Sequence, residues 1–470
     1  MKKIFFLLLL PLSLQAQKNY PVLIDQYMQA AVNINQFSGS VLVAKHNKII
    51  YQKVFGTLDY ANTKLLDSNS MFELGNITEE FTAAAILLLK DQGKLKLTDP
   101  VTKYLPELPY NTVTIKHLLT HTAGLPDFYD EGMKGKWGTD KLATNRDIIK
   151  SLAAANMPLK WKPGTKNDDY HYYTEFPLLA SVIEKISGLS YTDFMQQKIF
   201  APIHLNHTKV FAELQINKKL HPNHTESVYF DESKQKFLPA DSFKYFGPEL
   251  SYAINGVLGE IGISSTAGDL FLWNRALKNN SLLSESTKRE MFTPYALKDT
   301  VNKIFLGYGV LTGKNEHGNY VQQRDDGNKL TLGYITTLLN YTKEDFTIIV
   351  CANKAKPSSN IAGVLSYILF DKEVILPYIH KEVSIDTSML NKYAGEYALP
   401  RVTKVYKKEG TLWMTINEEP DLKLLPESPT KFFSSNKEYD WQITFETDKN
   451  GNVVKTYFIF SGLKKEAKRL

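Results

Sequence analysis

Apolar and polar positions along the chain repeat with two different periods, and these periods predict its main elements. Residues 22–36 place apolar side chains at helical spacing. Residues 40–55 have the pattern of two strands around the polar turn His46-Asn47-Lys48. The apolar run from Ala83 to Leu89 predicts a further helix, which we expect to end near Gly93.

The second half of the chain is richer in strand patterns. Four segments predict the closing strands of an antiparallel sheet: residues 306–311, 320–323, 334–341 and 347–352. Beyond residues 381–387, a set of short strands is expected to begin at residues 390–397, with turns at Lys408-Glu-Gly410 and at residues 448–452. Short, regularly spaced strands favour a small barrel or a curled sheet.

The first residues have the three parts of a secretory signal. Lys2 and Lys3 supply the positive start, residues 4–12 the apolar centre, and Ala16 a small residue for cleavage. We therefore expect a signal peptide over residues 1–16, cleavage near Ala16, and a periplasmic or secreted protein. The apolar run is too short to span a bilayer and no later segment is apolar enough, so no transmembrane segment is expected after cleavage.

The composition is that of an ordinary globular chain. Its 470 residues are 43% hydrophobic and 23% charged, which is enough for two domains. The net charge is +6, but the lysines are scattered and matched by 50 acidic residues, so nucleic-acid binding is not expected. Cys351, the single cysteine, lies in a buried-strand pattern and is predicted to be a core thiol.

Three long segments carry a family resemblance: residues 71–106, 114–127 and 256–273. They resemble the β-lactamase-related serine hydrolases, a group that includes class C β-lactamases, D-Ala-D-Ala carboxypeptidases and related esterases. The resemblance implies an α+β fold of the β-lactamase/transpeptidase-like sandwich type over residues 17–382, with an antiparallel sheet flanked by helices and a helical lobe. Residues 388–470 resemble the lipocalin-like β-domain often appended to these proteins, and we expect a small antiparallel barrel there.

The catalytic position of the first segment has changed. In the family this segment carries Ser-x-x-Lys, a nucleophilic serine and a lysine that helps to activate it. This chain has Asn76 in the serine slot and Glu79 in the lysine slot. A side-chain amide has no hydroxyl to deprotonate and cannot form an acyl-enzyme, while a carboxylate reverses the charge of the lysine. The same residues also fit a structural interpretation, in which Asn76 caps the helix and Glu79 and Glu80 lie in its first turn.

The family's second motif, Tyr-x-Asn in a segment that opens with Pro-Gly-Thr, is also altered. After Pro-Gly-Thr at residues 163–165, the alignment places His171, Tyr172 and Tyr173 in the slot, and the asparagine is lost. The tyrosine survives, displaced, as Tyr170 or Tyr172. We take Tyr172 as the positional equivalent of the catalytic tyrosine and predict that Tyr170, His171 and Tyr173 bind a ligand. Clustered tyrosines are also a common packing surface.

The third motif, His-x-Gly before the strand that begins Gly333-Tyr334, lacks its histidine. Arg324 and Asp326 occupy this stretch and are predicted ligand-binding residues, because the arginine could bind a carboxylate that the aspartate would repel. His317 precedes a glycine but lies farther upstream, in a predicted hairpin turn.

Metal and cofactor chemistry is not expected from the sequence. His117 and His121 have the spacing of a metal pair on a helix, but no third ligand is evident, and a structural role is favoured. No organic cofactor is implied by the resemblance.

Three functions are compatible with these residues. The preferred one is a catalytically inactive pseudoenzyme that binds a small molecule, a peptide, a cell-wall fragment or a similar ligand in the inherited cleft. The second is an active hydrolase of esterase, peptidase or β-lactamase type, in which Glu79 acts as a general base with His171 or Tyr172 as its acid partner. The third is an interaction module that acts through the C-terminal β-domain.

Overall fold

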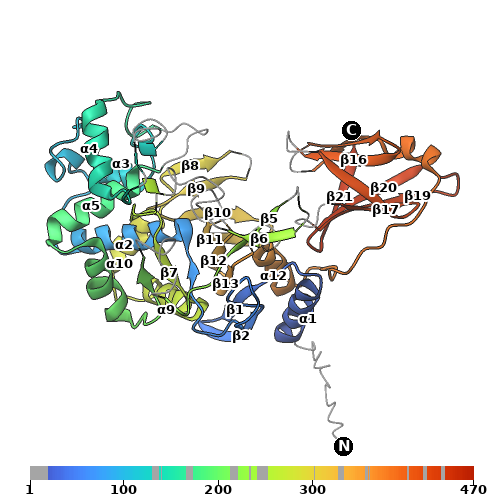
Figure 1. The fold of residues 1–470 in the computed structure, drawn as a ribbon, viewed down its shortest axis with the longest axis horizontal. Helices are drawn as coiled ribbons and strands as arrows, with labels where there is room; N and C mark the ends of the chain where they lie inside the picture. Colours follow the sequence, from blue (N-terminus) through green and yellow to red (C-terminus); the bar gives the residue numbers. More distant parts are fainter. Residues whose placement is uncertain are drawn as a thin grey trace, which may run out of the picture.

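The structure, a computed structural model, describes most of the chain. The described residues are 19–129, 137–138, 140–165, 173–211, 221–231, 234, 236–240, 252–253, 255–300, 302–325, 333–354, 358, 360–399, 402–416, 421–435 and 440–470. The predicted signal peptide lies outside them. Figure 1 shows a large sheet with helices on both sides, a helical lobe at one end, and a barrel at the other.

The central sheet has eight strands in the order β2-β1-β13-β12-β11-β10-β9-β8, and each neighbouring pair is antiparallel. The strands are β1 (Gly39–Lys45), β2 (Lys48–Phe55), β8 (Ala296–Asp299), β9 (Ile304–Leu306), β10 (Leu311–Asn315), β11 (Gly318–Asp325), β12 (Ile335–Tyr341) and β13 (Phe346–Ala352). The hairpin predicted over residues 40–55 is confirmed. Cys351 lies in β13 as a buried free thiol, as predicted.

One predicted strand is wrong. Residues 306–311 do not form a single strand, because β9 ends at Leu306 and β10 begins at Leu311. Gly309 lies in the turn between them with φ of +64°, a conformation that ends a ladder and favours glycine. A Cβ atom on Gly309 would lie 2.6 Å from the backbone oxygen of Glu79, so this turn packs directly on the start of helix α2 (Thr78–Asp91).

Helices cover both faces of the sheet (Figure 1). Helices α1 (Tyr20–Asn33) and α12 (Ile361–Leu369) share one apolar core with the sheet. Helices α2 and α9 (Ala267–Lys278) belong to the core on the other face. Every residue of β12 and β13 is buried as a result, which is the pattern of strands covered on both sides.

The helical lobe and a small sheet complete this part of the molecule. The lobe contains α3 (Ile115–Leu119), α4 (Asn145–Ala155), α5 (Glu175–Ser187), α6 (Tyr191–Phe194) and α10 (Glu285–Met291). Helix α5 packs against α2, α3 and α4. A three-stranded sheet joins β3 (Phe72–Glu73), β7 (Ile263–Ser265) and β4 (Lys209–Val210), and a hairpin joins β5 (Val228–Asp231) and β6 (Lys236–Pro239).

The C-terminal strands close into an antiparallel eight-stranded barrel, as the fold prediction requires. The strands are β14 (Gly395–Ala398), β15 (Val402–Lys408), β16 (Thr411–Ile416), β17 (Leu422–Ser428), β18 (Lys431–Ser434), β19 (Trp441–Thr447), β20 (Val453–Phe460) and β21 (Leu463–Arg469). Both predicted turns are confirmed. The strands begin later than predicted, because residues 387–393 form a 3-10 helix whose Tyr393 ring stacks on Phe445 inside the barrel, 4.1 Å between centroids.

The turn between β20 and β21 contacts the first helix of the chain. The hydroxyl of Tyr27 in α1 donates a hydrogen bond of 2.8 Å to the backbone oxygen of Ser461. The next residue, Gly462, has φ of +89°, and its carbonyl accepts a 3.0 Å hydrogen bond from the backbone N–H of Ile375. The first contact joins the barrel to α1, and the second joins it to the segment that follows α12.

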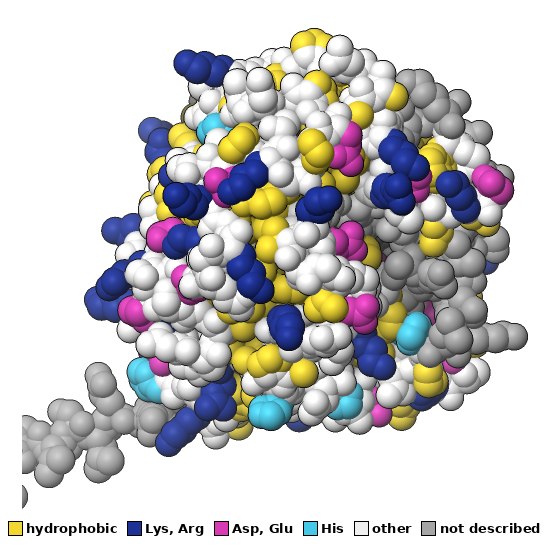
Figure 2. Space-filling view, turned by 90° about the vertical axis from the view of Figure 1, so that its left-hand side faces the viewer, with side chains coloured by type: hydrophobic (Ala, Val, Ile, Leu, Met, Phe, Trp, Pro, Cys, Tyr) yellow, Lys and Arg dark blue, Asp and Glu magenta, His cyan; other side chains and the backbone are white. Residues whose placement is uncertain are grey.

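The surface of the helical lobe mixes charges of both signs. Figure 2 shows basic side chains on this face interspersed with acidic and apolar ones. In the portion of the chain that the structure describes, each helix is too short or too polar to cross a membrane.

Candidate functional site

The start of helix α2 differs from the predicted capping box. Asn76 lies in a 3-10 turn, η1 (Gly75–Ile77), and the residue before the helix is Ile77, which makes no side-chain capping bond. Asn76 therefore does not cap α2, and that prediction is wrong. Glu79 and Glu80 do lie in the first turn, as expected, but both are buried. The η1 turn packs against β11 and β12, which places the old nucleophile position on the central sheet.

Glu79 faces a histidine. Its Oε2 lies 3.3 Å from Nε2 of His121, and the two side chains are only 12% and 7% exposed. His121 follows helix α3 with φ of +51°, and its ring lies on Phe176 with 5.0 Å between centroids. The carboxyl group of Glu79 is therefore directed toward an imidazole from a different segment of the chain.

His117 has a different role from His121. It occupies the third position of α3, where its Nδ1 accepts a 3.2 Å hydrogen bond from the backbone N–H of Thr114. Thr114 Oγ1 in turn accepts a 3.3 Å bond from the backbone N–H of His117. This reciprocal cap confirms the structural role predicted for His117. Within the described residues, no group of three or more His, Cys, Asp or Glu side chains is arranged to hold a metal ion.

Two further carboxyl groups lie beside this pair. Glu175, in the first turn of α5, is 1% exposed, and Glu260, in the glycine-rich segment before β7, is 3% exposed. Burial raises the pKa of Glu175 to about 7; His121 opposes the rise, and Glu79 and Asp127 add to it. Burial raises the pKa of Glu260 well above its ordinary value, with the charges of Glu79, Glu175 and Asp127 adding to the effect.

The backbone explains why these two carboxyl groups meet. Gly259 has φ of +112°, and a Cβ atom there would lie 2.5 Å from the backbone oxygen of Phe176. The carbonyl of Gly259 also accepts a 2.6 Å hydrogen bond from Thr82 of α2. The segment that carries Glu260 is thus held against both α5 and α2, beside Glu175.

Glu80 is buried on the α9 side of helix α2. Burial raises the pKa of Glu80 to about 8, and the indole of Trp273 opposes the rise. Phe81, the next residue, stacks on Trp273 with 4.0 Å between ring centroids. The first turn of α2 therefore carries two buried acids, one directed to His121 and one to the core.

The arrangement has clear chemical consequences. Position 79, in the first turn of α2, carries a carboxyl group where the family has an ammonium, and position 76 carries an amide where the family has a hydroxyl. Protonation of Glu175 and Glu260 relieves the repulsion among neighbouring carboxylates. A carboxylate and an imidazole in contact can transfer protons, whereas an amide cannot act as a nucleophile.

Of the other predicted site residues, Tyr173 and Arg324 belong to the described part of the chain. Tyr170, His171, Tyr172 and Asp326 lie outside the described residues. Arg324 belongs to strand β11, which ends at Asp325, beside the η1 turn that carries Asn76. Tyr173 is half-buried and packs against the core of the helical lobe, immediately before α5.

Sequence reasoning missed Glu175, Glu260 and the pairing of His121 with Glu79. A signal for the two acids was present: Glu175 opens an otherwise apolar helix, and Glu260 interrupts a run of glycine and apolar residues. Such isolated charges in apolar surroundings are rarely buried without a specific reason.

A serine–histidine contact occurs elsewhere in the fold. His224 Nε2 lies 3.0 Å from Ser264 Oγ. Ser264 is fully buried in β7, the middle strand of the three-stranded sheet. A substrate cannot reach this hydroxyl without opening that sheet, so the contact is structural.

Comparison with known proteins places the chain among relatives of this architecture. Residues 23–365 match the family model described as Beta-lactamase, and residues 380–464 match a domain of unknown function, DUF3471. Penicillin-binding protein 4* of Bacillus subtilis (strain 168) is 31% identical over 452 residues, which cover 93% of this chain and 95% of that protein.

Two solved structures share the fold. The octameric penicillin-binding protein homologue from Pyrococcus abyssi matches with a TM-score of 0.63 at 21% sequence identity. The match covers 95% of this chain and 99% of the homologue's chain. The penicillin binding protein from Bacillus halodurans matches with a TM-score of 0.60 at 21% sequence identity. The match covers 73% of this chain and 99% of that protein's chain. The predicted fold class is therefore confirmed.

Proposed function

Because this chain belongs to the Beta-lactamase family, we propose that it is a catalytically inactive member that binds a peptide, a cell-wall fragment or a similar ligand in the inherited cleft. The observation that carries this proposal is the contact of Glu79 with His121, 3.3 Å apart, in the position where the family has its lysine. With Asn76 in the serine slot, both members of the nucleophile pair have changed together.

Physical chemistry argues against acyl transfer at this position. An acyl-enzyme needs a hydroxyl or thiol that can lose its proton and attack a carbonyl. Asn76 has neither, and Glu79 cannot lend the positive charge of a lysine. Members of such a unit contribute little alone, so neither substitution compensates for the other.

The same site retains features of a binding site. Neither carboxyl oxygen of Glu175 has a hydrogen-bond partner among the described residues, although the side chain is 1% exposed. A buried polar group in this state gains free energy when a ligand supplies the missing hydrogen bonds. The predicted ligand-binding residues Tyr170, His171, Tyr173, Arg324 and Asp326 complete this proposal.

Covalent probes test the proposal. The purified full-length protein is incubated with a fluorophosphonate and, separately, with a penicillin, and its intact mass is measured after denaturation. We expect no mass increase, because no activated hydroxyl is available. A serine hydrolase added to the same tube confirms that the probe is active. One adduct per chain would overturn the proposal and identify a nucleophile elsewhere.

A second function, a hydrolase with a changed mechanism, is favoured by the contact between Glu79 and His121. Glu79 would accept a proton from water, and His121 would be its acid partner in place of His171 or Tyr172, which the sequence predicts for that role. Hydrolysis of small esters that falls at least about a hundredfold in Glu79→Gln, but not in Glu107→Gln on an exposed turn, would support it. Equal rates in both variants would remove Glu79 from any mechanism.

The cellular setting and the division of the chain are also proposals. We propose a signal peptide over residues 1–16, a hydrolase-like domain over residues 17–382 and a β-domain over residues 388–470, in a periplasmic or secreted protein. N-terminal sequencing of protein recovered from the cell envelope or medium should begin near residue 17. Recovery from the cytoplasm with an intact Met1 would contradict this.

A further inference from the structure

A pocket lies on the opposite face of the central sheet from Glu79. It has a volume of about 180 Å³ and is bordered by the β10–β11 hairpin, strand β12 and helix α12. Its apolar wall, which includes Leu339 and Ala362, belongs to the core shared with α1 and α12. The carboxyl cluster packs with the other core, so the two sites are separated by the sheet.

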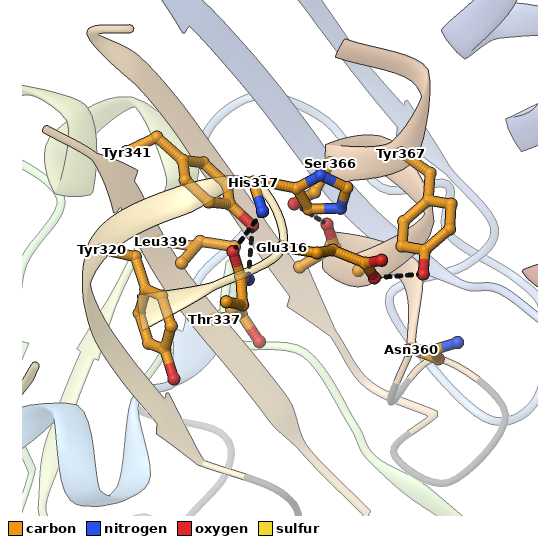
Figure 3. A pocket seen from close by; sticks show the side chains of 12 residues that line it. Glu316, His317, Tyr320, Thr337, Leu339, Tyr341, Asn360, Ser366 and Tyr367 are labelled. Atoms are coloured by element: carbon orange, nitrogen blue, oxygen red, sulfur yellow. Dashed lines mark hydrogen bonds between the residues drawn. The ribbon is translucent and has the colours of Figure 1, made fainter. Parts of the chain in front are cut away.

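The pocket is built around one histidine. Figure 3 shows His317 between Tyr341 on the sheet side and Ser366 and Tyr367 on the helix side, with Glu316 close by. His317 occupies the turn of the β10–β11 hairpin, as predicted, because Asn315 pairs with Gly318. Its backbone N–H donates a 2.9 Å hydrogen bond to the side-chain oxygen of Asn315, which fixes the turn.

Aromatic packing holds the ring of His317 in place. The ring stacks on Phe370 at 4.7 Å and 18°, and meets the edge of Tyr367 at 4.8 Å and 86°. The residue is 7% exposed, and within the described chain neither ring nitrogen has a hydrogen-bond partner. A ring that is fixed in position and lacks polar partners is prepared for a ligand that brings its own hydrogen-bonding groups.

The remaining polar groups are also arranged in advance. Glu316 accepts a hydrogen bond from the hydroxyl of Tyr367, and Asn315 Nδ2 donates a 3.0 Å bond to the hydroxyl of Tyr341. Tyr320 and Thr337 line the sheet side of the pocket. These contacts link the hairpin, the sheet and α12, so the lining does not depend on the ligand for its shape.

The chemistry of the lining selects a ligand class. Burial lowers the pKa of His317, and Glu316 opposes this, so at neutral pH the ring is uncharged, with one donor and one acceptor nitrogen. The carboxylate of Glu316 disfavours an anion. Hydroxyl groups both donate and accept, and tyrosine rings offer apolar faces to the C–H groups of a small ring. The volume of about 180 Å³ is below the roughly 300–1,000 Å³ of pockets for drug-sized ligands, which suits a single ring.

We propose that this pocket binds one ring of a neutral polyhydroxylated ligand, such as a monosaccharide unit, with a ring nitrogen of His317 hydrogen-bonded to one of its hydroxyl groups. The proposal is independent of the function assigned to the Glu79 site. The rim of the pocket also touches the barrel: Asn360 Nδ2 donates a 3.5 Å hydrogen bond to the backbone oxygen of Phe460, and a Cβ atom on Gly363 would lie 4.0 Å from Leu463.

Ligand-observed NMR on the full-length protein tests the assignment. Glucose, glucosamine and glucuronate share one ring and differ in charge, so the affinities of these three probes measure the charge preference of the pocket. We expect glucose to bind, and glucuronate to bind at least about tenfold more weakly, because Glu316 repels it. Glucuronate binding as tightly as glucose, or no binding of glucose at millimolar concentration, would overturn the proposal.

Variants locate the site. His317→Phe keeps the aromatic stacking and removes both nitrogens, and we expect glucose affinity to fall about tenfold or more. His317→Gln, which restores a donor and an acceptor, should recover part of the loss and serves if the phenylalanine variant does not fold. Tyr60→Phe removes an exposed hydroxyl outside the pocket and should bind as the wild type does. Unchanged affinity in His317→Phe would show that glucose binds elsewhere.

Discussion

Helices α2 and α9 begin in different ways, although both lie in segments that resemble the same family. At the start of α9, Thr266 Oγ1 accepts a 3.1 Å hydrogen bond from the backbone N–H of Asp269, so this helix has a side-chain cap from a residue type that commonly supplies one. At the start of α2, no side-chain cap is present and two glutamates are buried. The cap from Thr266 stabilises α9, whereas burial of the Glu80 carboxyl group in the first turn of α2 is unfavourable.

This difference suggests that α2 begins where it does for reasons other than stability. A sequence usually violates local rules at functional positions and compensates for the cost elsewhere. Buried carboxyl groups are costly, and those of Glu80, Glu175 and Glu260 keep high pKa values because of that burial. The site therefore holds an energetically unfavourable group of buried acids, which agrees with the ligand-binding function proposed above.

The largest expected effect on stability comes from removing the aromatic contact between helices α2 and α9. Phe81→Ala removes the ring that stacks on Trp273 and joins α2 to α9. Because Phe81 is fully buried, we expect the free energy of unfolding to fall by about 3–5 kcal/mol. Denaturant unfolding measures this. Leu23→Ala on the exposed side of α1 should change stability by less than about 0.5 kcal/mol, and a similar loss in both variants would mean that the stack does not join the helices.

The next effect concerns the cost of a buried acid at α2. The pKa of Glu80 is about 8 in the folded protein and 4.5 without burial, so the folded state binds more protons between these values. The contribution of Glu80 to the free energy of unfolding is therefore greatest below about pH 4.5. It falls as the pH rises from there to about 8. From about pH 5 to about pH 8 the loss from Glu80 is on the order of 3 kcal/mol.

Glu80→Gln should remove this part of the pH dependence. Unfolding free energies of the variant and the wild type, measured across the same pH range, should diverge toward alkaline pH with the variant more stable. Glu107→Gln, on an exposed turn, provides the control and should follow the wild type. Parallel curves for Glu80→Gln and the wild type would show that Glu80 is not the buried acid described above.

The smallest expected effect comes from removing the side-chain cap of α9, so that this helix, like α2, begins without one. Thr266→Ala removes the oxygen that accepts from Asp269, and we expect a loss of about 1 kcal/mol in unfolding free energy. Thr192→Ala, at an exposed position of α6, should cost less than about 0.5 kcal/mol. If the two variants are equal, the cap at α9 contributes nothing and the contrast between the helix starts disappears.

Features that depend on a few neighbouring residues could be predicted from the sequence. The cap of α9, the β1–β2 hairpin and the turn at Lys408-Glu-Gly410 each rest on a signal within a few positions. The cap proposed for Asn76 rested on the same kind of signal and failed. The reason is that Glu79 gains a partner in His121, from a different segment, which no local pattern reveals.

The carboxyl cluster could not be predicted for a related reason. Glu79, Glu175 and Glu260 come from three distant segments, and the close approach of Gly259 to α5 brings two of them together. The substitution of the nucleophile pair, by contrast, was visible at once, because Asn76 and Glu79 lie within an otherwise intact segment. A substitution within one segment is thus easier to recognise from the sequence than contacts between side chains of distant segments.

The central claim is that the position where the family has its lysine carries a buried carboxyl group, Glu79, and that the neighbouring carboxyl groups of Glu175 and Glu260 are buried and protonated. Infrared spectra near pH 6, about two units above the ordinary pKa of glutamate, test it most directly. We predict a carbonyl band of protonated carboxyl groups in the wild type that weakens in Glu175→Gln and again in Glu260→Gln. A wild-type spectrum without that band, with every carboxyl group ionised, would contradict the account.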